Sequence, residues 1–217
     1  MHDHTETRPS DGGDTNGQNP REGISGFGSG VMIETSEGPL PVEWLRAGDL
    51  VLTRDHGYRP LRWVGRSEMS HAPPIRIFAG AFGERTPEHD LVLSPHHQVL
   101  MSSPLVPLYF AEEEVLAPVS AITTEAEEDF VSRNPDHALC HLLFDQHEVV
   151  LAEGVWLESL FPDAPYLDLL GRDSEQDMRD AIGTNLDTMI TARMVLNSRE
   201  VALLKPRSAI AVRRMVA

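Results

Sequence analysis

The 217-residue chain has a single cysteine, Cys140, so it cannot form an internal disulfide. Basic residues are also scarce, because 18 Lys and Arg stand against 34 Asp and Glu and the formal net charge is −16. Such a chain lacks the basic patch from which binding to nucleic acid or to an acidic membrane surface draws its affinity. No run approaches the roughly 20 apolar residues that a membrane helix needs. We therefore expect no nucleic-acid partner and no membrane partner.

Residues 1–23 contain no apolar residue after Met1 and are rich in Asp, Gly, Thr and Asn. This segment cannot supply the apolar core of a signal peptide and cannot offset the entropy of ordering, so it predicts a disordered tail. The rest of the chain is apolar enough to bury one good core. We expect a soluble protein that is cytoplasmic or is exported without a cleaved signal.

What the sequence does contain is a series of short strands between residues 31 and 66. Runs of β-branched, aromatic and other apolar residues at 31–33, 51–53 and 61–64 are each broken by Gly, Pro or Asp. The breaks carry turn chemistry, with glycines for positive φ and Asp for local hydrogen bonds. Residues 42–45 between two of these breaks are long enough for only one helical turn. This pattern is typical of an all-β domain.

Three blocks of this sequence resemble Hint domains, the hedgehog/intein self-processing module, in its bacterial variant. The first block reads G-x-x-P-V-E-x-L-x-x-G-D, then T-R-D-x-G, then L-R-W-V-G-R, over residues 38–66. The second covers residues 90–100 and the third residues 141–160. The resemblance implies an all-β, horseshoe-like Hint fold over residues 24–162. Residues 163–217 would then form a short C-terminal helical extension packed on that domain.

In the family that the chain resembles, a cysteine precedes the Phe of a C-F-x-x-G-T-x-I motif and attacks the carbonyl of the preceding residue. Aligned on Phe27, that position is Gly26, which has no nucleophile. An acyl shift needs a β-oxygen or β-sulfur on the residue just after the bond to be cut. Ser25 and Ser29 meet that condition, although a serine hydroxyl needs a well-placed base. Ser in a Gly-rich lead-in can equally be an ordinary linker residue.

The second block contains Ser94-Pro95-His96-His97, which is similar to the T-x-x-H pattern of inteins with Ser94 in place of Thr. The resemblance implies that His97 contacts the nitrogen of the scissile amide and helps it depart. An imidazole suits this role because its pKa of about 6.5 lets it give or take a proton at neutral pH. The alternative is a hydrogen-bonded histidine that closes the turn before a strand at residues 98–101.

The third block alternates strongly and predicts a β-hairpin around residues 145–147. His141 and His147 match histidines near an Asp-x-His turn in similar domains, with Asp145 in that turn, and are candidates to activate the water that resolves an acyl intermediate. The alternative is that both are satisfied polar residues of strands. A zinc site built from these residues and His97 lacks a standard ligand spacing, so we expect no metal and no cofactor. Cys140 is expected to be a small buried hydrophobe.

After residue 162 the period becomes helical. A capping-box pattern at residues 174–177 precedes apolar residues at helical spacing, and together they predict one helix, weakened by Gly183. The apolar residues are Met178, Ile182, Leu186, Met189 and Ile190. No His-Asn pair ends the chain, so the step in which a C-terminal Asn cyclises has no residue to act through. We therefore expect no splicing with ligation.

Two functional hypotheses follow. The first is a Hint domain related to protein self-processing, whose substrate is its own N-terminal flanking peptide and whose activity is impaired because Gly26 replaces the cysteine. Its candidate residues are Ser25, Gly26, Ser94, His97, His141, Asp145 and His147. The second is a degenerate Hint module with a binding or structural role and no autocatalysis. Neither hypothesis predicts an enzyme that turns over.

Overall fold

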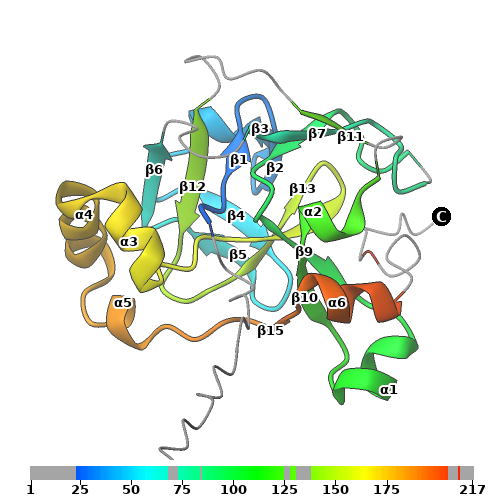
Figure 1. The fold of residues 1–217 in the computed structure, drawn as a ribbon. Helices are drawn as coiled ribbons and strands as arrows, with labels where there is room; N and C mark the ends of the chain where they lie inside the picture. The colour runs from blue at the N-terminus through cyan, green and yellow to red at the C-terminus, as the bar shows by residue number, and fades with distance from the viewer. Residues whose placement is uncertain are drawn as a thin grey trace, which may run out of the picture.

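The computed structural model describes residues 23–67, 73–83, 85–124, 128–130, 138–204 and 210. Within these residues the chain forms two β-sheets, with short helices placed at their margins (Figure 1). The expected all-β fold is therefore confirmed. The expected tail lies outside the described residues except for Gly23. No helix in the described ranges is long and apolar enough to span a membrane.

The first sheet contains the strand that carries the candidate site. Its order is β11-β7-β8-β1-β12-β6, and its neighbouring strands are antiparallel. The short strand β1 therefore lies in the middle of the sheet, between β8 and β12. The strands are β1 (Phe27–Gly28), β6 (Trp63–Ser67), β7 (Ile75–Ile77), β8 (Leu91–Leu93), β11 (Glu128–Phe130) and β12 (Leu139–Leu143).

The second sheet has the order β15-β10-β9-β14-β13-β2-β4-β5, and β3 pairs with β2 off this path. Strands β2 and β4 lie at two of the runs expected to be strands, 31–33 and 51–53, and the third run, 61–64, overlaps β6 of the first sheet. The hairpin partners β3 and β5 were not expected, and the one-turn segment η1 (Val42–Trp44) lies between the hairpins β2–β3 and β4–β5. The strands are β2 (Met32–Thr35), β3 (Gly38–Pro41), β4 (Leu50–Thr53), β5 (Gly57–Pro60), β9 (Gln98–Met101), β10 (Val115–Pro118), β13 (Val149–Ala152), β14 (Val155–Glu158) and β15 (Met194–Val195).

The main core lies where the inner strands of both sheets meet. Strands β9, β10, β12, β13 and β14 are buried at every position, whereas β2 alternates between buried and half-buried residues. Each large apolar side chain fully buried here, such as Phe27 or Ile33, contributes about 1.5–3 kcal/mol. Cys140 is 1% exposed and contacts this core, as expected of a small buried hydrophobe.

The predicted hairpin around residues 145–147 is wrong. Strand β12 pairs with β1 and β6 in the first sheet, whereas β13 belongs to the second sheet and pairs with β14. The hairpin is therefore β13–β14, and its turn is Glu153-Gly154, where both residues have positive φ (49° and 78°). The reason is that β12 and β13 are both fully buried, so their apolar pattern does not reveal which strands they pair with.

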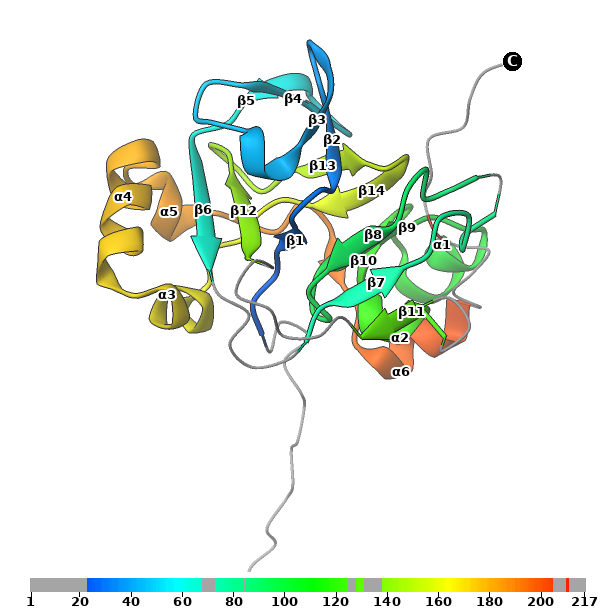
Figure 2. The same ribbon diagram turned by 90° about the horizontal axis from the view of Figure 1, so that it is seen from above.

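Between residues 164 and 204 the chain is largely helical and covers one side of β6 and β12 before it crosses to the other side of the molecule (Figures 1 and 2). The structure divides the single predicted helix into two. The first, α4, begins at Arg172, earlier than expected, and ends before Gly183, whose φ is +58°. The second is α5 (Asn185–Thr188). Met178, Ile182 and Leu186 are buried as expected, whereas Ile190 is 81% exposed.

The helical segments of the described residues are short. They are η1 (Val42–Trp44), α1 (Leu105–Phe110), α2 (Val119–Ile122), α3 (Ala164–Leu170), α4 (Arg172–Ile182), α5 (Asn185–Thr188), α6 (Ser198–Val201) and η2 (Ala202–Leu204). The segment between α5 and α6 includes β15, which adds to β10 as a parallel edge strand. The C-terminal extension thus contacts both sheets.

Candidate active site around Ser25

Ser25 and Gly26 lead directly into β1 and are held there by the strands on both sides. The carbonyl of Gly26 accepts a hydrogen bond from the Ser94 amide (3.0 Å), and Phe27 is paired with Leu93 and Cys140. Gly26 and Phe27 are buried, and Ser25 is half-buried. The backbone that follows Ser25 is therefore held within the sheet.

The side chain of Ser25 contacts a buried histidine. Its Oγ lies 3.0 Å from Nδ1 of His97, a residue placed by a tight turn in which the His97 amide donates to the Ser94 carbonyl (3.1 Å). The ring of Phe27 meets the His97 imidazole edge-on, with centroids 4.4 Å apart. Burial lowers the pKa of His97 to about 4, although the nearby Glu158 carboxylate raises it and so offsets part of this effect. His97 is therefore neutral at pH 7 and can accept the Ser25 proton.

A second buried histidine holds the backbone of the same residue. His141 Nδ1 lies 2.8 Å from the Ser25 carbonyl oxygen, and its Nε2 lies 2.8 Å from Ser67 Oγ. Because a carbonyl can only accept, Nδ1 carries the proton, and Ser67 donates to Nε2. Burial lowers the pKa of His141 to about 4. The ring also meets Tyr166 of α3 edge-on at 5.4 Å, so its orientation is fixed on several sides.

Gly26, which aligns with the cysteine of the resembled family, has no room for a side chain. A Cβ built there would lie 2.9 Å from His141 Cε1 and 2.9 Å from Leu139 Cβ. Real Cβ atoms do not approach other carbons so closely, and Leu139 Cβ is fixed to the backbone of β12. The space for a side chain at this position is therefore closed.

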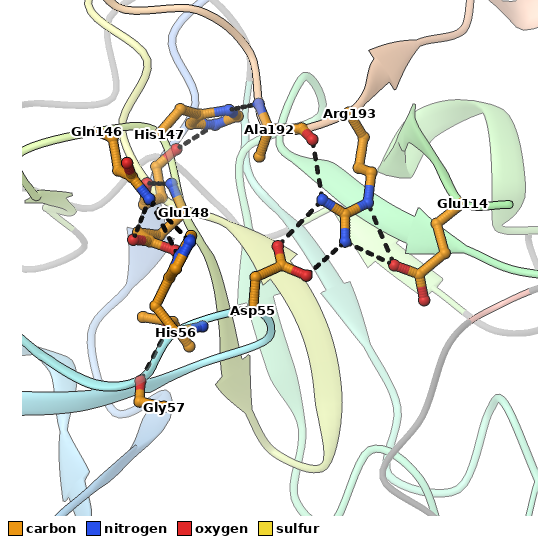
Figure 3. Close-up of polar contacts among 11 residues, drawn as sticks. Asp55, His56, Gly57, Glu114, Gln146, His147, Glu148, Ala192 and Arg193 are labelled. Atoms are coloured by element: carbon orange, nitrogen blue, oxygen red, sulfur yellow. Dashed lines mark hydrogen bonds and ion pairs between the residues drawn. The ribbon is translucent and has the colours of Figure 1, made fainter. Parts of the chain in front are cut away.

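The structure brings Ser25, Gly26, Ser94, His97 and His141 together; it places Asp145 elsewhere, and His147 lies against the site only through Glu158. Asp145 accepts three hydrogen bonds of 2.8–2.9 Å from the Arg62 guanidinium near the surface. His147 is buried, and its Nδ1 accepts from the Ala192 amide (2.9 Å) while Nε2 donates to the Ser159 carbonyl (3.2 Å) (Figure 3). Neither side chain contacts Ser25.

The candidate zinc ligands therefore do not converge. Asp145 is occupied by Arg62, and the His147 Nδ1 lone pair is occupied by Ala192. Among the described residues there is no group of three or more His, Cys, Asp or Glu side chains arranged to hold a metal ion.

Two residues of the site were not predicted. Glu158, at the end of β14, is 1% exposed; its Oε1 accepts from the Gln98 amide (3.1 Å), and its Oε2 lies 3.4 Å from His147 Nε2. Tyr166 is 3% exposed and covers His141. A carboxylate directly after the apolar run 155–157 was a usable signal for Glu158. Nothing in the sequence signalled Tyr166, because only the tertiary fold brings α3 to β12.

Comparison with known proteins agrees with this architecture. The Hint domain family model matches residues 25–164, so the chain belongs to the Hint domain family. Tyr166 and the rest of the extension lie beyond the matched range.

Similar solved structures include inteins. The gp41-1 intein is 14% identical, with a TM-score of 0.40, over 62% of this chain and 98% of the intein. The bacterial intein-like domain from Clostridium thermocellum is 13% identical, with a TM-score of 0.46, over 64% of this chain and all of that domain. No curated protein matches. These likenesses concern the fold.

Proposed function

We propose that this Hint domain cleaves its own chain between Ile24 and Ser25, with Ser25 as the nucleophile. The observation that carries the proposal is the 3.0 Å contact between Ser25 Oγ and Nδ1 of a neutral, buried histidine, His97. Ser25 also directly follows the bond to be cut, as an acyl shift requires. The substrate is the N-terminal segment of the same chain.

The chemistry has two steps. In the first, His97 takes the proton of the Ser25 hydroxyl as Oγ bonds to the carbonyl carbon of Ile24. His97 then gives that proton to the nitrogen of Ser25, and the bond from carbon to nitrogen breaks, which leaves an ester between Ile24 and Ser25 Oγ. In the second step water cleaves the ester, giving a free carboxyl on Ile24 and a free hydroxyl and amine on Ser25.

His141 acts as a positioning residue in this proposal. Its hydrogen bond to the Ser25 carbonyl fixes the peptide unit after the nucleophile, so that the Ser25 side chain stays directed toward His97. A serine hydroxyl is far less acidic than a thiol, whose pKa is about 8.5. The expected cleavage is therefore slow compared with that of a cysteine at the same site.

Ser29, the other serine candidate, is less well supported. It follows β1 in a turn, and its hydroxyl contacts no histidine among the described residues. The second candidate function, a degenerate binding or structural module, is favoured by one observation. That observation is the crowding at Gly26, where the position of the resembled family's nucleophile has closed.

Intact mass of the full-length chain after incubation at neutral pH, with and without hydroxylamine, tests the proposal. Hydroxylamine attacks an ester, so we expect a fragment that ends in the hydroxamate of Ile24 and a second fragment that begins at Ser25. Ser25→Ala should abolish both fragments, and Ser29→Ala, the matched control, should leave them unchanged. A single unchanged mass in all samples would favour the degenerate module instead.

A further inference from the structure

A small cavity lies beside Ser25. Its volume is about 10 Å³, which is room for about one water molecule. Gly23 and Ser25 both line it, so it borders the backbone on either side of Ile24. Two buried polar side chains that the proposed first step does not use, Glu158 and Tyr166, also line it.

Tyr166 presents an unused hydrogen-bond donor at this cavity. Its hydroxyl is buried and has no hydrogen-bond partner among the described residues. Burial and the nearby Glu158 carboxylate raise the pKa of Tyr166 well above its ordinary value, so the hydroxyl keeps its proton. Its backbone is fixed because the Tyr166 amide donates to the Asp163 carboxylate (2.9 Å) at the start of α3. A buried hydroxyl without a partner is costly and calls for an explanation.

Glu158 places an acceptor at the same cavity. One carboxylate oxygen accepts from the Gln98 amide, and the other lies 3.4 Å from the imidazole of His147. His147 is in turn held by the Ala192 amide of the C-terminal extension. The carboxylate therefore lies between two segments, those of Gln98 and His147. A buried acid beside a tyrosine donor is a suitable pair for holding and deprotonating one water.

We propose that Glu158 and Tyr166 hold the water that hydrolyses the Ile24 ester, an inference that rests on the proposed function. The water gives one proton to Glu158 as its oxygen bonds to the Ile24 carbonyl carbon. The bond from that carbon to Ser25 Oγ then breaks, and Oγ leaves with the proton that Glu158 took. The products are the Ile24 carboxylic acid and the Ser25 hydroxyl, and water is the only reactant consumed.

The two steps can be measured separately in the full-length chain by mass spectrometry. Fragments released by hydroxylamine report the ester, and fragments released without it report hydrolysis. We expect Tyr166→Phe to slow hydrolysis about 10-fold while release by hydroxylamine stays within about 2-fold of wild type, and we expect Glu158→Gln to slow hydrolysis about 100-fold. Tyr109→Phe on the exposed face of α1 is the matched control and should change neither.

Incubation in ¹⁸O-labelled water should place one label in the new Ile24 carboxylate of the hydrolysed fragment. If both kinds of release fall together in the folded Tyr166→Phe variant, or if neither falls, the water site is wrong. Tyr166→Phe removes one hydroxyl only and so remains informative if Glu158→Gln does not fold. A wild-type chain that releases no fragment with hydroxylamine would refute the proposed function itself, and the water site with it.

Discussion

Two groups of polar side chains join distant segments of this molecule, and they differ in charge. Around Ser25, the imidazoles of His97 and His141 are buried and neutral, with pKa values of about 4. Around Arg193, the contacts are ion pairs: its guanidinium contacts Asp55 at 2.7 and 3.0 Å and Glu114 at 2.8 Å (Figure 3). The hydrogen bond to Asp55 raises the pKa of Arg193 and lowers that of Asp55.

The difference shows two ways of using polar groups in one fold. The charged group is partly buried, and its ion pairs fasten the C-terminal extension to β10 and to the β4–β5 turn. In the neutral group, burial keeps the imidazoles uncharged at pH 7, so that an imidazole nitrogen can accept a proton. The extension takes part in both, since Arg193 anchors the first and Tyr166 covers the second. Variants in each group should therefore affect different properties.

The largest expected effect is on cleavage, in the neutral group. His97→Gln keeps a polar side chain of similar length but removes the base, so we expect the rate of hydroxylamine-dependent fragment release to fall by about 10²–10⁴. Quantitative mass spectrometry over time measures it. Arg193→Met, in the charged group, should leave that rate nearly unchanged. Equal losses in the two variants would remove the distinction between the groups.

The second effect is on stability in acid. His97 and His141 have folded pKa values of about 4 against 6.5 when unfolded. The unfolded chain therefore binds more protons between these values, and stability falls as the pH drops from 6.5 toward 4, by about 3 kcal/mol for each histidine. The lowered pKa of Asp55 acts only below its ordinary value of 3.8. The window from 6.5 to 4 thus belongs to the neutral group.

Urea unfolding at pH 7 and pH 4.5 checks this. The loss of stability between the two pH values should be smaller in His141→Gln than in wild type, because one of the two titrating groups is gone. The same loss in Arg193→Met should equal that of wild type. An identical loss in all three proteins would show that the two histidines do not titrate as buried groups.

The third prediction separates two places for a thiol. Ser25→Cys fits, since Ser25 already has a Cβ, and it should raise the cleavage rate by about 10-fold or more because a thiol ionises far more readily. Gly26→Cys restores the residue of the resembled family but meets His141 and Leu139, so it should destabilise the fold by about 1–3 kcal/mol. Fragment masses and urea unfolding measure the two effects. Faster cleavage in Gly26→Cys at unchanged stability would show that the space is still open.

The sequence predicted the parts of this structure that depend on local chemistry. Strands between residues 31 and 66 follow from turn residues and alternation, and the turn at Ser94 and His97 was found through a motif of four consecutive residues. Ser25 and Ser29 could be named as candidates because an acyl shift constrains where a nucleophile can stand in the chain. In each case the deciding information lay within a few residues.

The rest depends on which segments meet in space. The prediction of a hairpin at residues 145–147 was wrong because β12 and β13 are buried on both faces. The apolar pattern of such a strand does not indicate which strands it pairs with. The contact of His141 with the Ser25 carbonyl joins residues 116 positions apart. The packing of β14 and α3 brings Glu158 and Tyr166 into the site. The apolar run before Glu158 marks that residue as unusual, but no local pattern shows what it packs against.

The smallest expected effect concerns the attachment of the extension. Arg193 is 21% exposed and Glu114 13% exposed, and Glu114 keeps a second partner in Arg54 when Arg193 is lost. Arg193→Met should therefore cost about 1–2 kcal/mol, between the values for exposed and for buried ion pairs. Arg199→Met on exposed α6 is the matched control and should cost almost nothing.

Urea unfolding measures both variants, and a second readout locates the effect. Ala192 donates to His147, so loosening Arg193 should also speed hydrogen exchange at the Ala192 amide while the amides of β12 stay protected. Equal stability in the two variants would show that the contacts of the neighbouring β15 and the helices, not the charged group, hold the extension. The charged group would then be a consequence of the attachment and not its cause.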